Sequence, residues 1–209
     1  MLHTETVEPG TLSVLKRLMQ IPALQHFSLV GGTALSLRYG HRTSIDLDLF
    51  SEEKFQNAEI AEILKNEFGD AFSYEKTREQ HFGIFCFVAR VKVDIVRFPH
   101  PLIQPVEVND GIRMYGSSDI AAMKIQAILG RGRKKDFWDL SELLQHYPLQ
   151  QIVTWHREKY PSQMLAISIP DAIVYFDDAD ESEDPVSLKG QTWENVKQVI
   201  REKVSEYLR

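Results

Sequence analysis

The sequence predicts an α/β protein of the α+β kind, in which a small mixed β-sheet is flanked by helices and followed by a helical C-terminal part. Two observations support this prediction. Alternation of apolar and polar residues, clearest at residues 45–50 and 91–98, occurs within the first 115 residues. Beyond them, apolar residues recur three and four positions apart, as in helices. We therefore expect an α/β core over residues 1–115 and a helical part over residues 116–209 that packs on the core and does not fold independently.

Local patterns place the elements of the first part. Leucines at helical spacing indicate the first helix, and a Gly-Gly pair ends the first strand. The second helix has Thr33 as its expected N-cap and Gly40 as its C-cap. An Asn-Asp-Gly turn predicts a hairpin. In chain order we expect helix 10–20, strand 27–30, helix 33–39, strand 45–50, helix 58–68, strands 82–89 and 91–98, and a hairpin over 106–115.

The second part is predicted to be helical with one interruption. Periodic apolar residues indicate helices over 118–129, 134–145 and 192–208, and we expect further helix between residues 149 and 169. Six of the eight residues 177–184 are acidic. Such a block repels itself and cannot form a core, so it is expected to be a solvated loop or linker.

Composition excludes several classes of protein. Of the 209 residues, 43% are apolar and 26% charged, which is typical of a folded domain and rules out general disorder. The apolar runs are too short to span a membrane, and the N-terminus lacks the features of a secretion signal. The single cysteine, Cys86, permits no internal disulfide, so we expect a cytoplasmic location and no membrane partner.

The charge is distributed unevenly along the chain. A net charge of −6 argues against a surface built mainly to hold nucleic acid. Residues 131–135 nevertheless carry four positive charges in five positions. This basic run could hold RNA phosphates or form a solvated loop, and charge runs are more often the latter.

A pair of carboxylates provides the first chemical signal. Side chains two residues apart in a strand share a face, so Asp46 and Asp48 should project together while Ile45 and its apolar neighbours face inward. Two adjacent carboxylates repel each other unless a divalent cation lies between them. Asp94, in another alternating strand, can add a third ligand, and three such carboxylates can hold two Mg²⁺ ions. The alternative is a charged edge strand that discourages aggregation.

Two glycines precede this strand and open the second expected helix. Gly31 and Gly32 would let a phosphate approach the backbone closely, and the helix N-terminus offers free N–H groups to an anion. A phosphate site beside a metal-binding carboxylate pair indicates chemistry on a nucleoside triphosphate.

The chain resembles the DNA polymerase beta-like nucleotidyltransferase superfamily. The resemblance lies in the order of three motifs: the glycine pair, the Asp-x-Asp strand and the aspartate of a later strand. The longer pattern is similar to the AbiEii toxin family within it. The segments that carry the resemblance are residues 31–35, 41–50, 119–124, 133–140, 174–179 and 193–197. The superfamily's first motif often has Gly-Ser, whereas this chain has Gly32 and then Thr33, which could supply the phosphate-binding hydroxyl or only cap its helix.

The resemblance implies transfer of a nucleoside monophosphate from an NTP to an acceptor, with release of pyrophosphate. It implies that Asp46, Asp48 and Asp94 are catalytic and bind Mg²⁺, or alternatively Mn²⁺. Lys124 would be the helical lysine that meets the triphosphate. The residues expected to bind substrate are Gly31, Gly32, Thr33, Arg42, Lys92, Asp136 and Asp139.

Several of these residues also have a simpler interpretation. Without the resemblance, Lys124 would be taken as a solvated helix lysine. Asp136 and Asp139 share one helix face and could merely pair with the basic run beside them. Arg42 could contact a phosphate or brace Asp46, and the sequence does not separate the two roles.

The resemblance also implies a biological role, that of a toxin in a two-gene toxin–antitoxin or phage-defence system. The expected acceptor is RNA, above all tRNA, because some relatives add nucleotides to the acceptor end of tRNA, and an antitoxin protein is an expected partner. Two alternatives stay open. One is nucleotidylation of a protein, which the acidic net charge favours. The other is a nucleotide-binding module without catalysis, against which the intact carboxylates argue.

Overall fold

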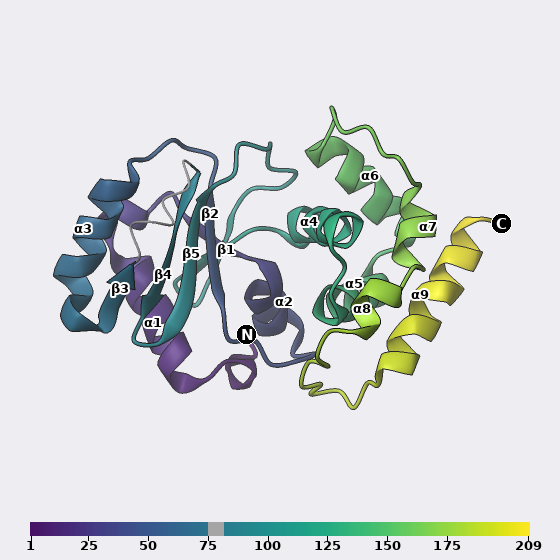
Figure 1. The fold of residues 1–209 in the computed structure, drawn as a ribbon, viewed down its shortest axis with the longest axis horizontal. Coiled ribbons are helices and arrows are strands. Elements are labelled where there is room, and N and C mark those ends of the chain that lie inside the picture. The colour runs from purple at the N-terminus through teal and green to yellow at the C-terminus, as the bar shows by residue number, and fades with distance from the viewer. Residues whose placement is uncertain (75–81) are drawn as a thin grey trace.

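The computed structural model of the chain describes residues 1–74 and 82–209. Its described strands form one mixed seven-stranded sheet in the order β3-β4-β5-β2-β1-β7-β6. The strands are β1 (Ser28–Val30), β2 (Leu47–Ser51), β3 (Phe72–Tyr74), β4 (Gly83–Val88), β5 (Val91–Arg97), β6 (Glu107–Asn109) and β7 (Ile112–Met114). The predicted fold class is confirmed, and these strands all lie within the first 115 residues (Figure 1).

The centre of the sheet combines parallel and antiparallel pairs. β2 runs parallel to β5 and antiparallel to β1, while β1 runs parallel to β7. Leu29, Leu49 and Ile95 are register partners in these strands, and their side chains, which share one face of the sheet, are buried. β2 therefore lies between β1 and β5, and any polar side chain it carries is held against both.

Helices flank the sheet and then form the C-terminal half. They are α1 (Pro9–Gln20), α2 (Gly31–Tyr39), α3 (Asn57–Phe68), α4 (Ser117–Gly130), α5 (Lys134–His146), α6 (Leu149–Lys159), α7 (Ile169–Ile173), α8 (Asp177–Asp180) and α9 (Trp193–Tyr207). Short 3-10 turns occur at Thr4–Thr6, Pro22–Leu24 and Gly69–Ala71. Within the described ranges, no helix combines the length and apolar character needed to cross a membrane.

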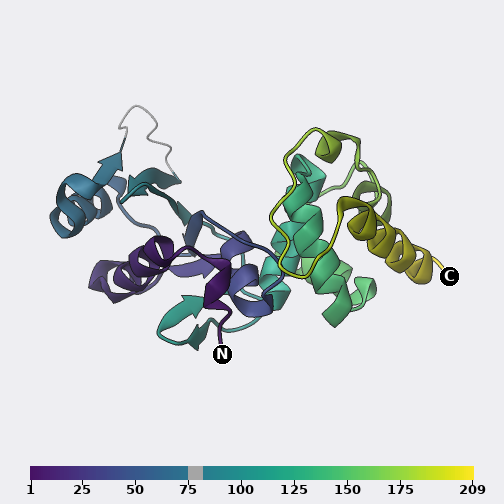
Figure 2. The same cartoon turned by 90° about the horizontal axis from the view of Figure 1, so that it is seen from below.

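α2 connects the two halves of the molecule. It contacts β1 and β2 on one side and α4 and α5 on the other, and it lies between the sheet and the C-terminal helices in both views (Figures 1 and 2). The buried apolar residues form one cluster that continues from the sheet into the helices. In the C-terminal half, Trp138 of α5 stacks on Trp193 of α9 with ring centroids 5.9 Å apart. The C-terminal helices thus reach the sheet through α2, and the expectation that they do not fold independently stays a prediction.

Two expectations about side chains around β2 are corrected. Thr33 does not cap α2, because the helix begins at Gly31 with Val30 as its N-cap residue. The Thr33 hydroxyl instead bonds the Ser44 hydroxyl at 2.8 Å and donates to the Asp46 carbonyl. Ile45 does not face inward, since β2 begins only at Leu47 and the Ile45 side chain is 64% exposed.

Two expectations about the C-terminal half are also corrected. The helix expected between residues 149 and 169 is interrupted, because α6 ends at Lys159 before Pro161 and α7 begins at Ile169. The acidic block is not wholly a loop, since its first residues form α8, whose Ala179 is buried. Asp180 accepts the indole N–H of Trp193 at 2.5 Å, so one acidic side chain of the block is fixed by an aromatic donor that needs a partner.

A buried ion pair ties α4 to α6. Lys159 and Asp119 are both fully buried, and the Lys159 ammonium lies 2.7 Å from the Asp119 carboxylate and 3.0 Å from the Pro101 carbonyl. The second role of Asp119 is to accept the backbone N–H groups of Ile103 and Gln104. These three contacts of Asp119, with Lys159, Ile103 and Gln104, hold the segment between β5 and β6 against α4.

Replacing Lys159 by Met tests this arrangement. The change preserves the length of the side chain but leaves the Asp119 carboxylate buried without its counter-ion, so we expect the free energy of unfolding to fall by about 3–5 kcal/mol. The matched control is Lys203→Met, which removes an exposed pair with Glu206 and should cost less than about 1 kcal/mol. Urea unfolding at neutral pH measures both, and equal losses would contradict the role given to Lys159.

Candidate active site

The register of the sheet brings two of the predicted carboxylates together. Asp48 in β2 lies directly opposite Asp94 in the parallel strand β5 and opposite Val30 at the end of β1. Gly31, which follows Val30, has φ +70°, and a Cβ atom there would lie 2.6 Å from Asp48 Oδ2. The Gly31 backbone therefore packs against the Asp48 carboxylate at the N-terminus of α2, which only a glycine permits.

The two carboxylates are electrostatically strained. Burial raises the pKa of Asp48, and the negative charges of Asp94 and, less strongly, Asp46 raise it further. The charges of Lys124 and Lys92 oppose this rise. Lys92 donates to Asp94 Oδ2 at 2.7 Å, whereas Asp94 Oδ1 is buried without a hydrogen-bond partner.

This arrangement fits a divalent cation at Asp48 and Asp94. Both supply the hard oxygen ligands that Mg²⁺ prefers, one oxygen is buried and unsatisfied, and a cation would relieve their mutual repulsion. Asp46 is turned differently, with Oδ2 3.8 Å from the Lys135 ammonium. Within residues 1–74 and 82–209, no three His, Cys, Asp or Glu side chains form a ready-made metal site. The metal role of Asp46, like the other two, stays a prediction.

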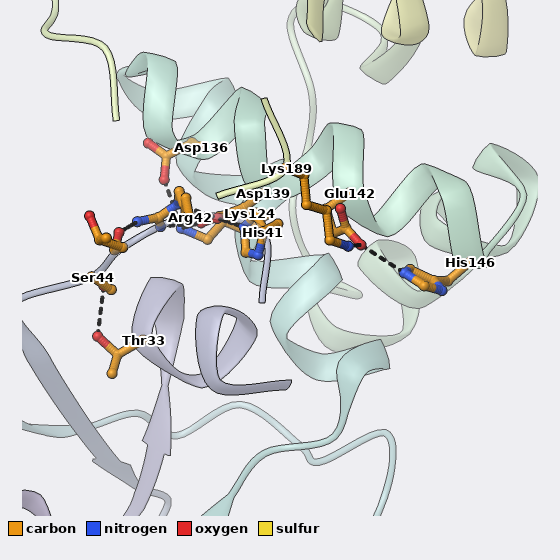
Figure 3. Close-up of polar contacts among 11 residues, drawn as sticks. Thr33, His41, Arg42, Ser44, Lys124, Asp136, Asp139, Glu142, His146 and Lys189 are labelled. Carbon is orange, nitrogen blue, oxygen red and sulfur yellow. Dashed lines mark hydrogen bonds and ion pairs between the residues drawn. The ribbon is translucent and has the colours of Figure 1, made fainter. Parts of the chain in front are cut away.

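A buried charge cluster lies beside these carboxylates. Arg42 binds both oxygens of Asp139, through Nε at 2.7 Å and Nη2 at 2.8 Å, and the His41 ring bonds the same carboxylate at 2.7 Å (Figure 3). All three side chains are buried. Burial disfavours the ionised form of Asp139, but Arg42 and Lys124 outweigh this and hold its pKa well below the usual range. The loop before β2 is therefore anchored to α5 by an ionised carboxylate.

Lys124 belongs to the same cluster rather than to solvent. Its ammonium lies 2.7 Å from Asp139 and 2.9 Å from Asp136, and the residue is buried. Burial opposes the charge on Lys124, but Asp139 and Asp136 outweigh it and raise the pKa. The interpretation of Lys124 as a solvated helix lysine is thus wrong. Its expected contact with a triphosphate stays a prediction, and in this structure its contacts are carboxylates.

Arg42 and Gly32 depend on each other. A Cβ atom on Gly32 would collide with Arg42 Nη2, so this glycine leaves room for the guanidinium. The remaining nitrogen of the fork, Nη1, donates to the Thr43 carbonyl at 2.9 Å. The sequence suggested that Arg42 contacts a phosphate or braces Asp46. In the structure its side chain instead binds Asp139. Its geometry is that of a residue that positions the loop leading to Asp46.

The structure groups the predicted residues into two sets. The first set, where β1 passes into α2 beside β2 and β5, contains Gly31, Asp48, Asp94 and Lys92. The second set, between α2, α4 and α5, contains Gly32, Arg42, Lys124, Asp136 and Asp139. Asp46 lies between the sets, since Thr33 holds its carbonyl and Lys135 faces its carboxylate.

Sequence reasoning missed the contact of Lys135 with Asp46 and the contact of His41 with Asp139. The basic run was the available signal for Lys135. No local pattern identifies the partner of His41.

A C-terminal segment also reaches this site. We call residues 182–190 the strap. The Val186 carbonyl accepts the Thr43 N–H at 3.0 Å, the Leu188 N–H donates to the His41 carbonyl at 2.9 Å, and Lys189 pairs with Glu142 of α5 at 2.7 Å (Figure 3). The loop before β2 is therefore held between α5 and the strap.

Comparisons with known proteins identify the family of this chain and its relatives. The model of the family described as nucleotidyl transferase AbiEii toxin, type IV TA system, matches residues 13–186. An uncharacterized protein of Aquifex aeolicus (strain VF5) is 34% identical over 203 residues, which cover 93% of this chain and 94% of that protein.

Solved structures share the fold at lower identity. A putative nucleotidyltransferase from H. pylori is similar with a TM-score of 0.58 and 18% identity, over 97% of this chain and 99% of that one. MenT4, a nucleotidyltransferase toxin from Mycobacterium tuberculosis H37Rv, has a TM-score of 0.59 and 15% identity, over 93% and 82% of the two chains. At such identities the likeness concerns the fold alone.

The packing of Gly31 against Asp48 can be tested with a pair of glycine variants. Gly31→Ala should lower the free energy of unfolding by about 1–2 kcal/mol, because alanine is strained at this left-handed backbone position. The collision of the new Cβ atom with Asp48 should lower it by about 1–3 kcal/mol more. Gly111→Ala is the control, because Gly111 has φ +78° with nothing within 4 Å of an added Cβ, so only the backbone cost applies. Denaturant unfolding compares the two, and similar losses would show that Asp48 does not press on Gly31.

The Asp139 cluster predicts a pH-dependent loss of stability. Asp139→Asn leaves Arg42 and Lys124 buried without this counter-charge, so the unfolding free energy at pH 7 should fall by about 3–5 kcal/mol. The folded pKa of Asp139 is depressed, so its stabilisation is complete above the unfolded value of about 3.9 and is lost as pH falls further.

The difference in stability between wild type and Asp139→Asn should therefore be constant from pH 7 to about 5 and shrink below about pH 4. Unfolding measured across this range tests the expectation. Asp70→Asn, at an exposed pair with Lys65, serves as the control and should stay close to wild type throughout. A difference that does not change down to pH 2 would mean that Asp139 is not stabilised in its ionised form.

Proposed function

The chain belongs to the AbiEii nucleotidyl transferase toxin family, and we propose that it moves a nucleoside monophosphate from an NTP to an RNA acceptor, releasing pyrophosphate. The observation that supports this most directly is the meeting of Asp48, Asp94 and the Gly31 backbone at the N-terminus of α2. Carboxylates for a divalent cation and free N–H groups for phosphate then lie side by side. Transfer to a nucleic acid hydroxyl needs both.

A bound Mg²⁺, or Mn²⁺, would neutralise the triphosphate and activate the attacking hydroxyl. Asp48 and Asp94 would hold it, and Asp46 would supply the third carboxylate in place of its pairing with Lys135. Lys92 would keep Asp94 oriented through its 2.7 Å contact. Lys124 would offset negative charge at Asp48 from its buried position in the second set of residues.

The biological setting is part of the same proposal. The matching family is described as toxins of type IV toxin–antitoxin systems, and the M. tuberculosis structure is described as a nucleotidyltransferase toxin. We therefore propose that this chain is a toxin that acts on RNA, with tRNA as the foremost acceptor and an antitoxin as its partner, in the cytoplasm. The local charge at Asp46, unlike the net charge of the chain, supports RNA over protein, because Lys135 brings a cation of the basic run to Asp46.

The proposal predicts label transfer that depends on the carboxylates. Purified protein with Mg²⁺ and each α-labelled NTP should label a tRNA-sized band in total RNA, which would identify the base and the acceptor together. Asp48→Asn combined with Asp46→Asn should reduce the label at least 100-fold, because the cation ligands are lost. Asp70→Asn, an acidic residue on the exposed surface, should keep wild-type transfer.

The same assay separates the remaining possibilities. If label enters a protein band in a whole-cell extract and does not enter RNA, the acceptor is a protein hydroxyl and not RNA. Bound NTP with no transfer to either pool would contradict catalysis and leave a nucleotide-binding module. Transfer that survives the double substitution would contradict the role of Asp46 and Asp48.

A further inference from the structure

A hollow of about 490 Å³ opens beside Asp46. One wall is the loop before β2, a second is the start of α5, and the third is the strap, which contributes Ser182 to Val186. Asp46 belongs to the lining, whereas Gly31 and Asp48 do not. The hollow is therefore adjacent to the carboxylates but separate from the predicted phosphate cradle at α2.

The basic run divides into two pairs at this hollow. Arg133 and Lys135 line it, and the Lys135 ammonium lies 3.8 Å from Asp46. Lys134 is used elsewhere, since it pairs with Asp184 at 2.8 Å and lies over the Trp193 ring. Arg131 is exposed and is not part of the lining. Two of the four cations of the basic run thus line the hollow.

We propose that Arg133 and Lys135 form a phosphate-binding subsite for one of the two substrates. An anion held by Lys135 would lie within a few ångströms of Asp46, close to the reacting groups. The Arg133 fork and the Lys135 ammonium suit phosphate oxygens. Because the hollow excludes Gly31 and Asp48, its position favours a phosphodiester of the acceptor strand over the triphosphate of the NTP.

The other walls indicate how the ligand lies. The strap contributes Glu183 and Asp184, which repel phosphate and accept hydrogen bonds from hydroxyl or amino groups. A phosphate would then lie on the α5 side, and sugar or base groups would face the strap. A second hollow of about 620 Å³ lies beyond residues 43–45, but the described residues that line it include Glu5 and Glu8 and no Lys or Arg. It is not suited to an anion.

Binding measurements on the full chain test the subsite without relying on turnover. Arg133→Gln and Lys135→Gln are compared with the matched variants Arg131→Gln and Lys134→Gln. The probes are a fluorescent eight-nucleotide oligoribonucleotide in EDTA, titrated at several salt concentrations, and each NTP with Mg²⁺. For the oligonucleotide we expect about fivefold weaker binding in each subsite variant, and a salt slope reduced by about 0.7, which corresponds to one lost phosphate contact.

The outcomes decide both the subsite and its ligand. Weaker oligonucleotide binding confined to Arg133→Gln and Lys135→Gln would support the subsite and assign it to the acceptor. Weaker NTP binding alone in these variants would support the subsite and assign it to the triphosphate. No change, an equal change in all four variants, or no binding of either probe by the wild type would overturn it.

This inference rests on the proposed function, because both probes are chosen from it. The two can still fail separately. Absence of label transfer by the wild type would remove the RNA transferase while leaving a measured phosphate subsite in place. Unchanged binding in the subsite variants would remove the subsite while leaving transfer intact.

Discussion

One buried carboxylate, Asp139, determines how the parts of this site can be arranged. It binds Arg42 from the loop before β2 and shares Lys124 of α4 with Asp136, so without Asp139 the buried guanidinium would lose its bidentate partner. Arg42 lies 97 positions away in the sequence, so the contact closes nearly half of the 209-residue chain into one loop. Gly32 leaves the space that the guanidinium needs. The position of Asp46 thus depends on a charge balance formed in the C-terminal half.

Much of the fold, and part of the site, could be predicted because the signals were local. Alternation in β2 and β5 identified the two strands, and their parallel register places Asp48 against Asp94 as three-carboxylate chemistry requires. Gly31, the first residue of α2, was predicted as a position of close approach to the backbone, and the group that approaches it in this structure is the Asp48 carboxylate. The family resemblance supplied the remaining residues, since spacing alone does not distinguish a ligand from an ordinary surface charge.

The errors occurred where a tertiary partner outweighed a local preference. Thr33 is a good N-cap residue, but the helix begins two residues earlier, at Gly31, and the Thr33 hydroxyl instead donates to the Asp46 carbonyl. From the sequence, Lys124 is expected on the solvent-facing side of its helix, yet ion pairs with two aspartates of α5 keep its side chain buried. Such pairings between distant segments leave no periodic trace in the sequence.

The strap shows why the helical half is more than an attachment to the sheet. It bonds the backbone on both sides of Arg42, and it pairs with Glu142, which lies one turn beyond Asp139 in α5. The hollow beside Asp46 therefore takes its walls from both halves of the chain. A chain that ended at residue 115 would keep Asp48 and Asp94 but lose Asp139, the strap and both subsite cations. The carboxylates belong to the sheet, whereas the surface that would present an acceptor to them exists only when the C-terminal half is in place.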